Sequence, residues 1–115
     1  MNARAETSWV DVCAVDDLPA LGARTVPRAG RAAIAIFRTA TGEVFALDDR
    51  CPHKGGPLSQ GIVFGKRVAC PLHNWTIELS TGEAVAPDRG CAHVHPVRVE
   101  NGRVLLAAST LDCAP

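Results

Sequence analysis

Tyrosine is absent from this chain of 115 residues, and aromatic residues as a whole make up only 4% of it. A core must therefore be built from Val, Ile, Leu and Ala, and the hydrophobic fraction of 47% is ordinary for a globular protein. No apolar run approaches the roughly 20 residues that cross a bilayer. The N-terminal residues contain no stretch like that of a signal peptide. We therefore expect a soluble, cytoplasmic protein with a single domain, residues 1–115.

Net charge is absent as well. Twelve basic and twelve acidic residues cancel, and no basic run stands out. This balance argues against nucleic acid or an anionic membrane surface as a partner. Five cysteines leave at least one unpaired in any disulfide scheme, because their number is odd. In the cytoplasm we expect them to be metal ligands or free thiols rather than disulfides.

The sequence also lacks a long helical periodicity. Short apolar runs bounded by Gly, Asp, Asn or Pro indicate strands instead. The expected strands are Trp9–Val15, Ala33–Phe37, Glu43–Leu47, Arg67–Cys70, Trp75–Leu79, His93–Val99 and Val104–Ala107. Asn101-Gly102 is the best two-residue hairpin turn, Pro96 indicates an edge strand or a bulge, and only Asp16–Ala20 suggests a helical turn. The pattern predicts an all-β fold, a sandwich or a small barrel.

The segment 49–74 interrupts this rhythm of strands and turns. It is dense in Pro and Gly and carries two short loops, Cys51-Pro52-His53 and Cys70-Pro71-Leu72-His73. Sixteen residues separate His53 from Cys70. Each loop offers one thiolate and one imidazole, so we expect a small lobe whose two loops close over a bound group.

Interleaved thiolates and imidazoles suit a two-iron cluster in which one iron takes both cysteines and the other takes both histidines. The alternative is structural zinc, which accepts the same four ligands but commonly groups like residues, as C-x2-4-C and H-x3-5-H. Pro52 and Pro71 follow the two cysteines and stiffen the loops. Gly55 and Gly56 let backbone amides approach the sulfides without a Cβ in the way. The alternation of residue types favours the iron–sulfur cluster.

The order C-x-H, sixteen residues, C-x-x-H resembles the motif of the Rieske proteins. This resemblance implies a Rieske-type antiparallel β-sandwich, with a small two-loop cluster-binding lobe inserted at about residues 49–77. It also implies a Rieske-type [2Fe-2S] cluster held by Cys51, His53, Cys70 and His73.

Three positions in the loops differ from one branch of that family. Members from cytochrome bc complexes carry an extra cysteine in each loop and a serine that donates to a bridging sulfide. Gly56, Leu72 and Trp75 stand at the corresponding positions here. Without those features we expect a low midpoint potential, on the order of −150 mV or below.

A longer stretch is similar to the small subunit of assimilatory NAD(P)H-dependent nitrite reductase. The similarity is carried by the loop Lys54–Gly61, by Asn74-Trp75 and by the segment Pro87–Cys91. It implies a cytoplasmic large subunit with flavin, sirohaem and another iron–sulfur centre, which reduces nitrite to ammonia in nitrate assimilation. The chain has no G-x-G-x-x-G motif for a nicotinamide. We therefore expect it to contribute electron transfer or a structural role within the complex, and to contain no catalytic residue or nitrite-reducing centre of its own.

Two other functions stay open at this point. A stand-alone Rieske ferredoxin that delivers electrons to a ring-hydroxylating oxygenase would carry the same cluster. An interaction module with structural zinc would use the same four ligands. The motif alone does not separate the first of these from a nitrite reductase subunit.

The remaining histidines and cysteines receive simpler interpretations. His93 and His95 share one face of a predicted strand, but without a second ligand pair nearby we expect solvated or hydrogen-bonded side chains rather than a second metal site. Cys13 and Cys91 are expected to be small buried hydrophobes, and Cys113 a free, exposed thiol.

Four basic residues fall in or beside the expected lobe: Lys54, Lys66, Arg67 and Arg89. They could form a basic rim that binds an acidic partner, but ordinary solvated charge is the preferred interpretation. Trp75 is expected to pack beside the lobe rather than to carry electrons.

Overall fold

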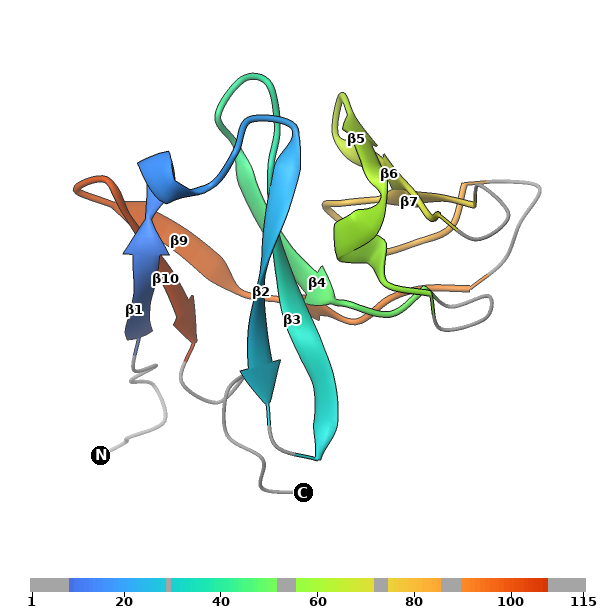
Figure 1. Cartoon of the computed structure of the whole chain (residues 1–115), viewed down its shortest axis with the longest axis horizontal. Helices are drawn as coiled ribbons and strands as arrows, with labels where there is room; N and C mark the ends of the chain where they lie inside the picture. The colour runs from blue at the N-terminus through green and yellow to red at the C-terminus, as the bar shows by residue number, and fades with distance from the viewer. Residues whose placement is uncertain (1–8, 29, 52–55, 72–74, 86–89, 108–115) are drawn as a thin grey trace.

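The computed structural model describes residues 9–28, 30–51, 56–71, 75–85 and 90–107, and these form three antiparallel sheets (Figure 1). The strands are β1 (Trp9–Ala14), β2 (Gly22–Arg28), β3 (Arg31–Arg38), β4 (Val44–Asp48), β5 (Ile62–Phe64), β6 (Arg67–Ala69), β7 (Thr76–Glu78), β8 (Val94–His95), β9 (Val97–Glu100) and β10 (Arg103–Ala107). Two short 3-10 helices, η2 (Val15–Asp17) and η3 (Leu58–Gln60), complete the described elements. The prediction of an all-β fold is confirmed. In the described part of the chain, no helix has the length and apolar character needed to cross a membrane.

The three sheets form successive layers. The terminal sheet has the order β1-β10-β9, the central sheet β2-β3-β4-β8, and the lobe sheet β5-β6-β7. Figure 1 shows the central sheet between the other two, with the lobe sheet on one side and the terminal sheet on the other. The lobe sheet and η3 come from the segment between β4 and β8, so the lobe is an excursion from the two larger sheets, as the sequence predicts.

Strand β3 explains why the central sheet can be covered on both faces. Successive side chains of a strand point to opposite faces, and four consecutive residues of β3 are buried. Ile34 and Ile36 pack in a body core against the terminal sheet, whereas Ala35 and Phe37 pack in a lobe core against the lobe sheet. A run of apolar residues rather than an alternating pattern is typical of a strand buried on both faces.

Two strands lack the apolar runs that predict the others. Strand β2 has the sequence GARTVPR, in which Val26 is the one large apolar residue, and it lies at the edge of the central sheet. Its place is fixed by six residue pairs with β3, which no local pattern reveals. Strand β5 has only three residues and lies between Gly61 and Gly65, so its signal is lost in the glycine-rich segment.

The expected strand His93–Val99 is divided at Pro96. Residues before it form β8 at the edge of the central sheet, and residues after it form β9 at the edge of the terminal sheet. Because proline cannot donate a ladder hydrogen bond, it lies where the chain passes from one sheet to the other. The next turn, Asn101-Gly102, joins β9 to β10 with positive φ at both residues, 52° and 74°, as the predicted hairpin requires.

Candidate metal centre

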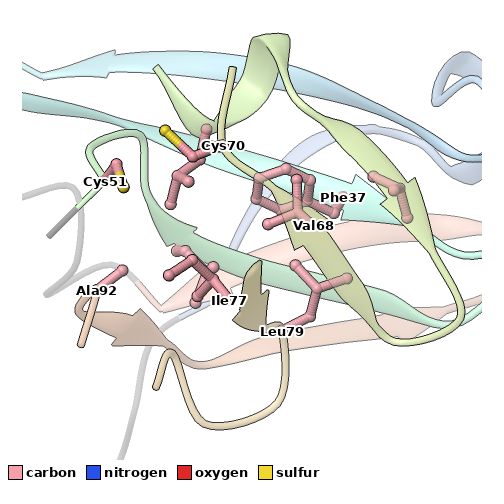
Figure 2. Packing of buried hydrophobic residues seen from close by; sticks show 11 residues of the cluster. Phe37, Cys51, Val68, Cys70, Ile77, Leu79 and Ala92 are labelled. Atoms are coloured by element: carbon pink, nitrogen blue, oxygen red, sulfur yellow. The ribbon is translucent and has the colours of Figure 1, made fainter. Parts of the chain in front are cut away.

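The lobe core lies between the central sheet and the lobe sheet and contains two of the predicted ligands (Figure 2). Its buried members are Ala35, Phe37, Leu47, Cys51, Leu58, Val63, Val68, Cys70, Ile77, Leu79 and Ala92. Cys51 is 2% exposed and Cys70 is 1% exposed. Figure 2 shows both toward one end of this core, with Phe37 and Leu79 toward the other. The fold therefore brings together two cysteines that are far apart in sequence, in a site shielded from water.

Backbone hydrogen bonds hold both cysteines in the same way. The Cys51 amide donates to the Gly56 carbonyl at 2.8 Å, and the Cys70 amide donates to the Trp75 carbonyl at 2.7 Å. Each bond joins a cysteine to a residue five positions further along, so each closes a short loop over the residues between. Cys51 follows the end of β4 and Cys70 follows β6, which means that each loop starts from a paired strand.

The predicted histidine ligands, His53 and His73, lie outside the described residues. Within the described ranges, no group of three or more His, Cys, Asp or Glu side chains could hold a metal ion. Among the described residues, no disulfide joins Cys13, Cys51, Cys70 or Cys91. Cys113 falls outside the part that the structure describes.

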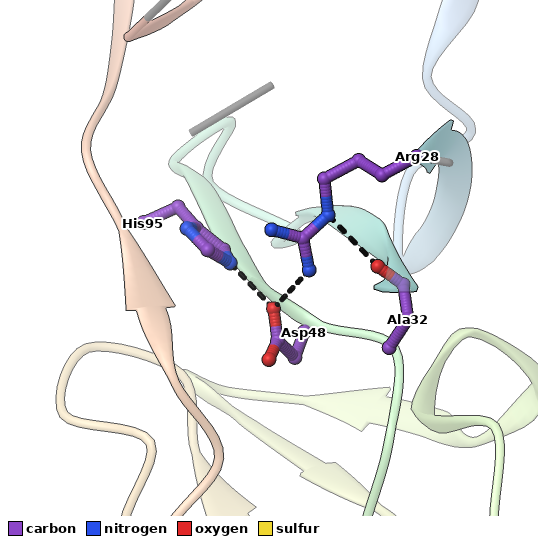
Figure 3. Close-up of polar contacts among 4 residues, drawn as sticks. All are labelled: Arg28, Ala32, Asp48 and His95. Carbon is purple, nitrogen blue, oxygen red and sulfur yellow. Dashed lines mark hydrogen bonds and ion pairs between the residues drawn. The ribbon is translucent and has the colours of Figure 1, made fainter. Parts of the chain in front are cut away.

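A buried polar network beside this region was missed in the sequence (Figure 3). Asp48, at the end of β4, accepts a hydrogen bond on Oδ1 from Arg28 Nη2 at 2.7 Å, and the same oxygen lies 2.6 Å from His95 Nε2. Arg28 Nε also donates to the Ala32 carbonyl at 2.8 Å. The side chains of Arg28 and His95 are 1% and 3% exposed. Three strands of the central sheet, β2, β4 and β8, are joined through one carboxylate.

Burial determines the charge of His95 in this network. Loss of hydration lowers the pKa of His95, although its hydrogen bond to Asp48 acts in the opposite direction. We therefore assign a neutral imidazole at pH 7, which donates from Nε2 to the Asp48 carboxylate. His93 lies next to it, with ring centroids 4.7 Å apart. The prediction of a hydrogen-bonded side chain is confirmed for His95.

The expectation that Cys91 is buried is wrong, because the structure exposes it. Cys91 forms an isolated bridge with Glu83, and the following residue, Ala92, is only 5% exposed. In an extended segment adjacent side chains point to opposite sides, so Ala92 takes the inner position and Cys91 the outer one. Cys13, in contrast, is buried as expected, and burial raises the pKa of its thiol.

The lobe residues singled out for charge or size have ordinary surroundings. Lys66 Nζ lies 3.2 Å from Glu43 Oε2, and Arg67 Nε lies 2.5 Å from Glu78 Oε2, both at the surface. Lys54 and Arg89 lie outside the described ranges. Trp75 packs, partly buried, against the lobe core, which agrees with the packing role predicted for it.

Comparison with known proteins identifies the fold. The Rieske [2Fe-2S] domain matches residues 8–98. The ferredoxin component of the naphthalene 1,2-dioxygenase/salicylate 5-hydroxylase systems of a Ralstonia species is 33% identical over 100 residues, which are 86% of this chain and 94% of that protein.

Two solved structures are similar over almost their whole length. One is a chain from the complex of reduced oxygenase and oxidised ferredoxin in carbazole 1,9a-dioxygenase, with a TM-score of 0.78, 31% identity, and coverage of 89% of this chain and 94% of that one. The other is a putative NADH-dependent nitrite reductase small subunit from Mycobacterium tuberculosis, with a TM-score of 0.78, 28% identity, and coverage of 89% and 96%. On the domain match and this shared fold, the chain belongs to the Rieske [2Fe-2S] family of electron-transfer proteins and carries a Rieske-type two-iron cluster.

Proposed function

We propose that the chain is the electron-transfer small subunit of a cytoplasmic NAD(P)H-dependent nitrite reductase. In this proposal it forms one Rieske domain, residues 1–115, with the cluster-binding lobe at about residues 49–77. The ligands are Cys51 and Cys70 for one iron and His53 and His73 for the other.

The two described ligand positions fit a two-iron cluster. Cys51 and Cys70 are both buried at one end of the lobe core, and the predicted histidine follows each of them by two or three residues in the sequence. A pair of buried cysteines in a mainly apolar core can supply two thiolates to one iron while keeping water away from them. When bound, a Rieske cluster supplies one-electron transfer at a potential tuned by its ligands and their hydrogen bonds.

The contribution of this chain is to hold the two described cysteines in place. The backbone bonds from Cys51 to Gly56 and from Cys70 to Trp75 tie each cysteine to the residue five positions further along. Ile77 and Leu79 of the neighbouring segment are fully buried against them and limit movement. A site that changes little between oxidation states needs little reorganisation, which suits rapid electron transfer.

The assignment to nitrite reductase rests on residues outside the four-ligand motif. The loop Lys54–Gly61, Asn74-Trp75 and the segment Pro87–Cys91 are the features similar to nitrite reductase small subunits. The fold of the Mycobacterium tuberculosis protein described above, which this chain matches over 89% of its length, supports the same assignment. The partner would be a large subunit that carries flavin, sirohaem and a further iron–sulfur centre and contains the nitrite-reducing centre.

A second candidate function is supported by a different observation. The ferredoxin component from Ralstonia is 33% identical over 100 residues, a higher identity than the 28% of the nitrite reductase small subunit. On this alternative the chain would be a stand-alone ferredoxin that delivers electrons to a ring-hydroxylating oxygenase. The ligands and the cluster would be the same, so only the partner separates the two functions.

Deletion of the gene in its own host tests the choice of partner. We expect loss of growth on nitrite as the sole nitrogen source, restored by the wild-type chain but not by the Cys70→Ala variant. Growth on ammonia is the control and should be unaffected. Normal growth on nitrite combined with failure to oxidise an aromatic growth substrate would reject the nitrite reductase assignment in favour of the ferredoxin.

A further inference from the structure

The carboxylate of Asp49 joins the two ends of the segment that contains Cys51, the first ligand loop. Asp49 follows the last residue of β4, and its Oδ1 accepts a hydrogen bond from the Ser59 amide at 2.6 Å. Its Oδ2 accepts a second bond from the Ser59 hydroxyl at 2.8 Å. Both oxygens of Asp49 therefore hold a single residue of η3, on the far side of the loop that contains Cys51.

The two hydrogen bonds between Asp49 and Ser59 are called the clamp below. The contacts of the residues beside them show which parts of the fold the clamp joins. The Asp49 amide donates to the Ala33 carbonyl at 2.8 Å, which ties it to the central sheet. Ser59 follows Leu58, which is fully buried in the lobe core. The Asp49–Ser59 contact thus joins the sheet to the lobe around the loop, outside the inner bond from the Cys51 amide to the Gly56 carbonyl.

The clamp also places a charge near the first ligand. Asp49 is two residues from Cys51 and only partly exposed. Neighbouring Asp48 is paired with Arg28, but in the described part of the chain no ion pair joins Asp49 to a basic side chain. A carboxylate charge disfavours the addition of an electron nearby, because the reduced cluster is more negative.

We propose that Asp49 is a positioning residue for Cys51, which holds the first ligand loop closed through Ser59 and lowers the midpoint potential of the cluster through its charge. This inference rests on the ligand assignment of the proposed function. Charge and geometry can be separated with two substitutions. Asp49→Asn removes the charge but keeps an oxygen that can accept from the Ser59 amide, whereas Ser59→Ala keeps the charge but removes the hydroxyl bond.

The test uses the purified holoprotein and two measurements, the midpoint potential by redox titration and the rate at which a chelator removes iron. Asp49→Asn should shift the midpoint potential upward, and Ser59→Ala should lose iron several-fold faster than wild type with little change in potential. Asp49→Ala should show both effects. Asp16→Asn, an exposed acid in η2, is the matched charge control and should change neither.

An Asp49→Asn potential equal to or below that of wild type would overturn the role of the charge. If Ser59→Ala lost iron at the wild-type rate, the proposed role of the Asp49–Ser59 contact in holding the first ligand loop would be wrong. Cys51→Ala separates these results from failure of the ligand assignment: if it retained the complete cluster spectrum, Cys51 would not be a ligand whatever the Asp49 variants do.

Discussion

The two cores of the molecule both contain buried cysteines, but in different backbone settings. In the body core, Cys13 lies within β1 and is paired in register with Val104 of β10. In the lobe core, Cys51 lies three residues after the end of β4 and Cys70 directly follows β6, and the amide of each donates to a carbonyl five residues further along. All three side chains are at most 4% exposed.

Burial therefore does not distinguish the proposed ligands Cys51 and Cys70 from the structural Cys13 in this protein. Burial raises the pKa of Cys13, so its thiol stays protonated and packs as a small apolar group. A ligand cysteine must also have room for a metal beside it. A cysteine at the start of a loop can have that room, whereas one in the middle of a paired strand is enclosed by its neighbours.

The largest expected effect comes from the same substitution in the two cores. Cys70→Ala should abolish the bound cluster, because one iron would lose its proposed thiolate ligand. Cys13→Ala removes the same atom from a site of equal burial and should keep a full cluster. Visible absorption together with iron and labile-sulfide content measures the difference. Retention of the cluster in Cys70→Ala, or its loss in Cys13→Ala, would contradict the division between the cores.

A second pair of substitutions compares adjacent residues of β3. Phe37 belongs to the lobe core and Ile36 to the body core, and both are 1% exposed or less. Phe37→Leu and Ile36→Val should each lower the free energy of unfolding by about 1 kcal/mol. Only Phe37→Leu should also accelerate loss of iron to a chelator, because the wall beside the ligand loops would loosen.

Chemical unfolding of each variant gives the stability, and iron release gives the state of the site. Equal acceleration of iron release in both variants would mean that global stability, rather than the lobe core, controls retention of the cluster. The comparison is informative because the two residues share a strand and differ in the face to which they point.

Most of the correct predictions came from local sequence patterns, namely short motifs and hydrophobic runs. The candidate ligands Cys51 and Cys70 were found from a short motif, and hydrophobic runs located most strands within a few residues. Strand β2 was missed because its few apolar residues gain their place only through pairing with β3. The direction of Cys91 was wrong because either it or Ala92 could take the inner position, and only the tertiary packing decides between them.

The Arg28–Asp48–His95 network was beyond prediction for a related reason. Its members are 20 and 47 residues apart in sequence, and each alone looks like an ordinary strand residue. Only the order β2-β3-β4-β8 brings them to one place. The network belongs to the central sheet that separates the two cores, so it provides a test of that sheet alone.

The smallest expected effect is the pH dependence that His95 gives to stability. Burial holds the pKa of His95 below the unfolded value of about 6.5. Between these two values the unfolded chain binds more protons, so acidification favours unfolding. The contribution is complete above about pH 6.5 and is lost as pH falls toward the folded pKa. We expect His95→Gln, which keeps a donor for Asp48, to lose less stability than wild type between pH 7.5 and pH 5.

Unfolding by urea at several pH values measures this difference, and subtraction of the variant from wild type cancels the titration of groups common to both. His93→Gln is the matched control, since His93 lies beside His95 but is exposed. Its profile should follow wild type. A constant difference in stability between wild type and His95→Gln across this pH range would show that His95 binds protons equally in both states. Burial in the central sheet would then not control its charge, and the Asp48 carboxylate would have to compensate fully for the lost hydration.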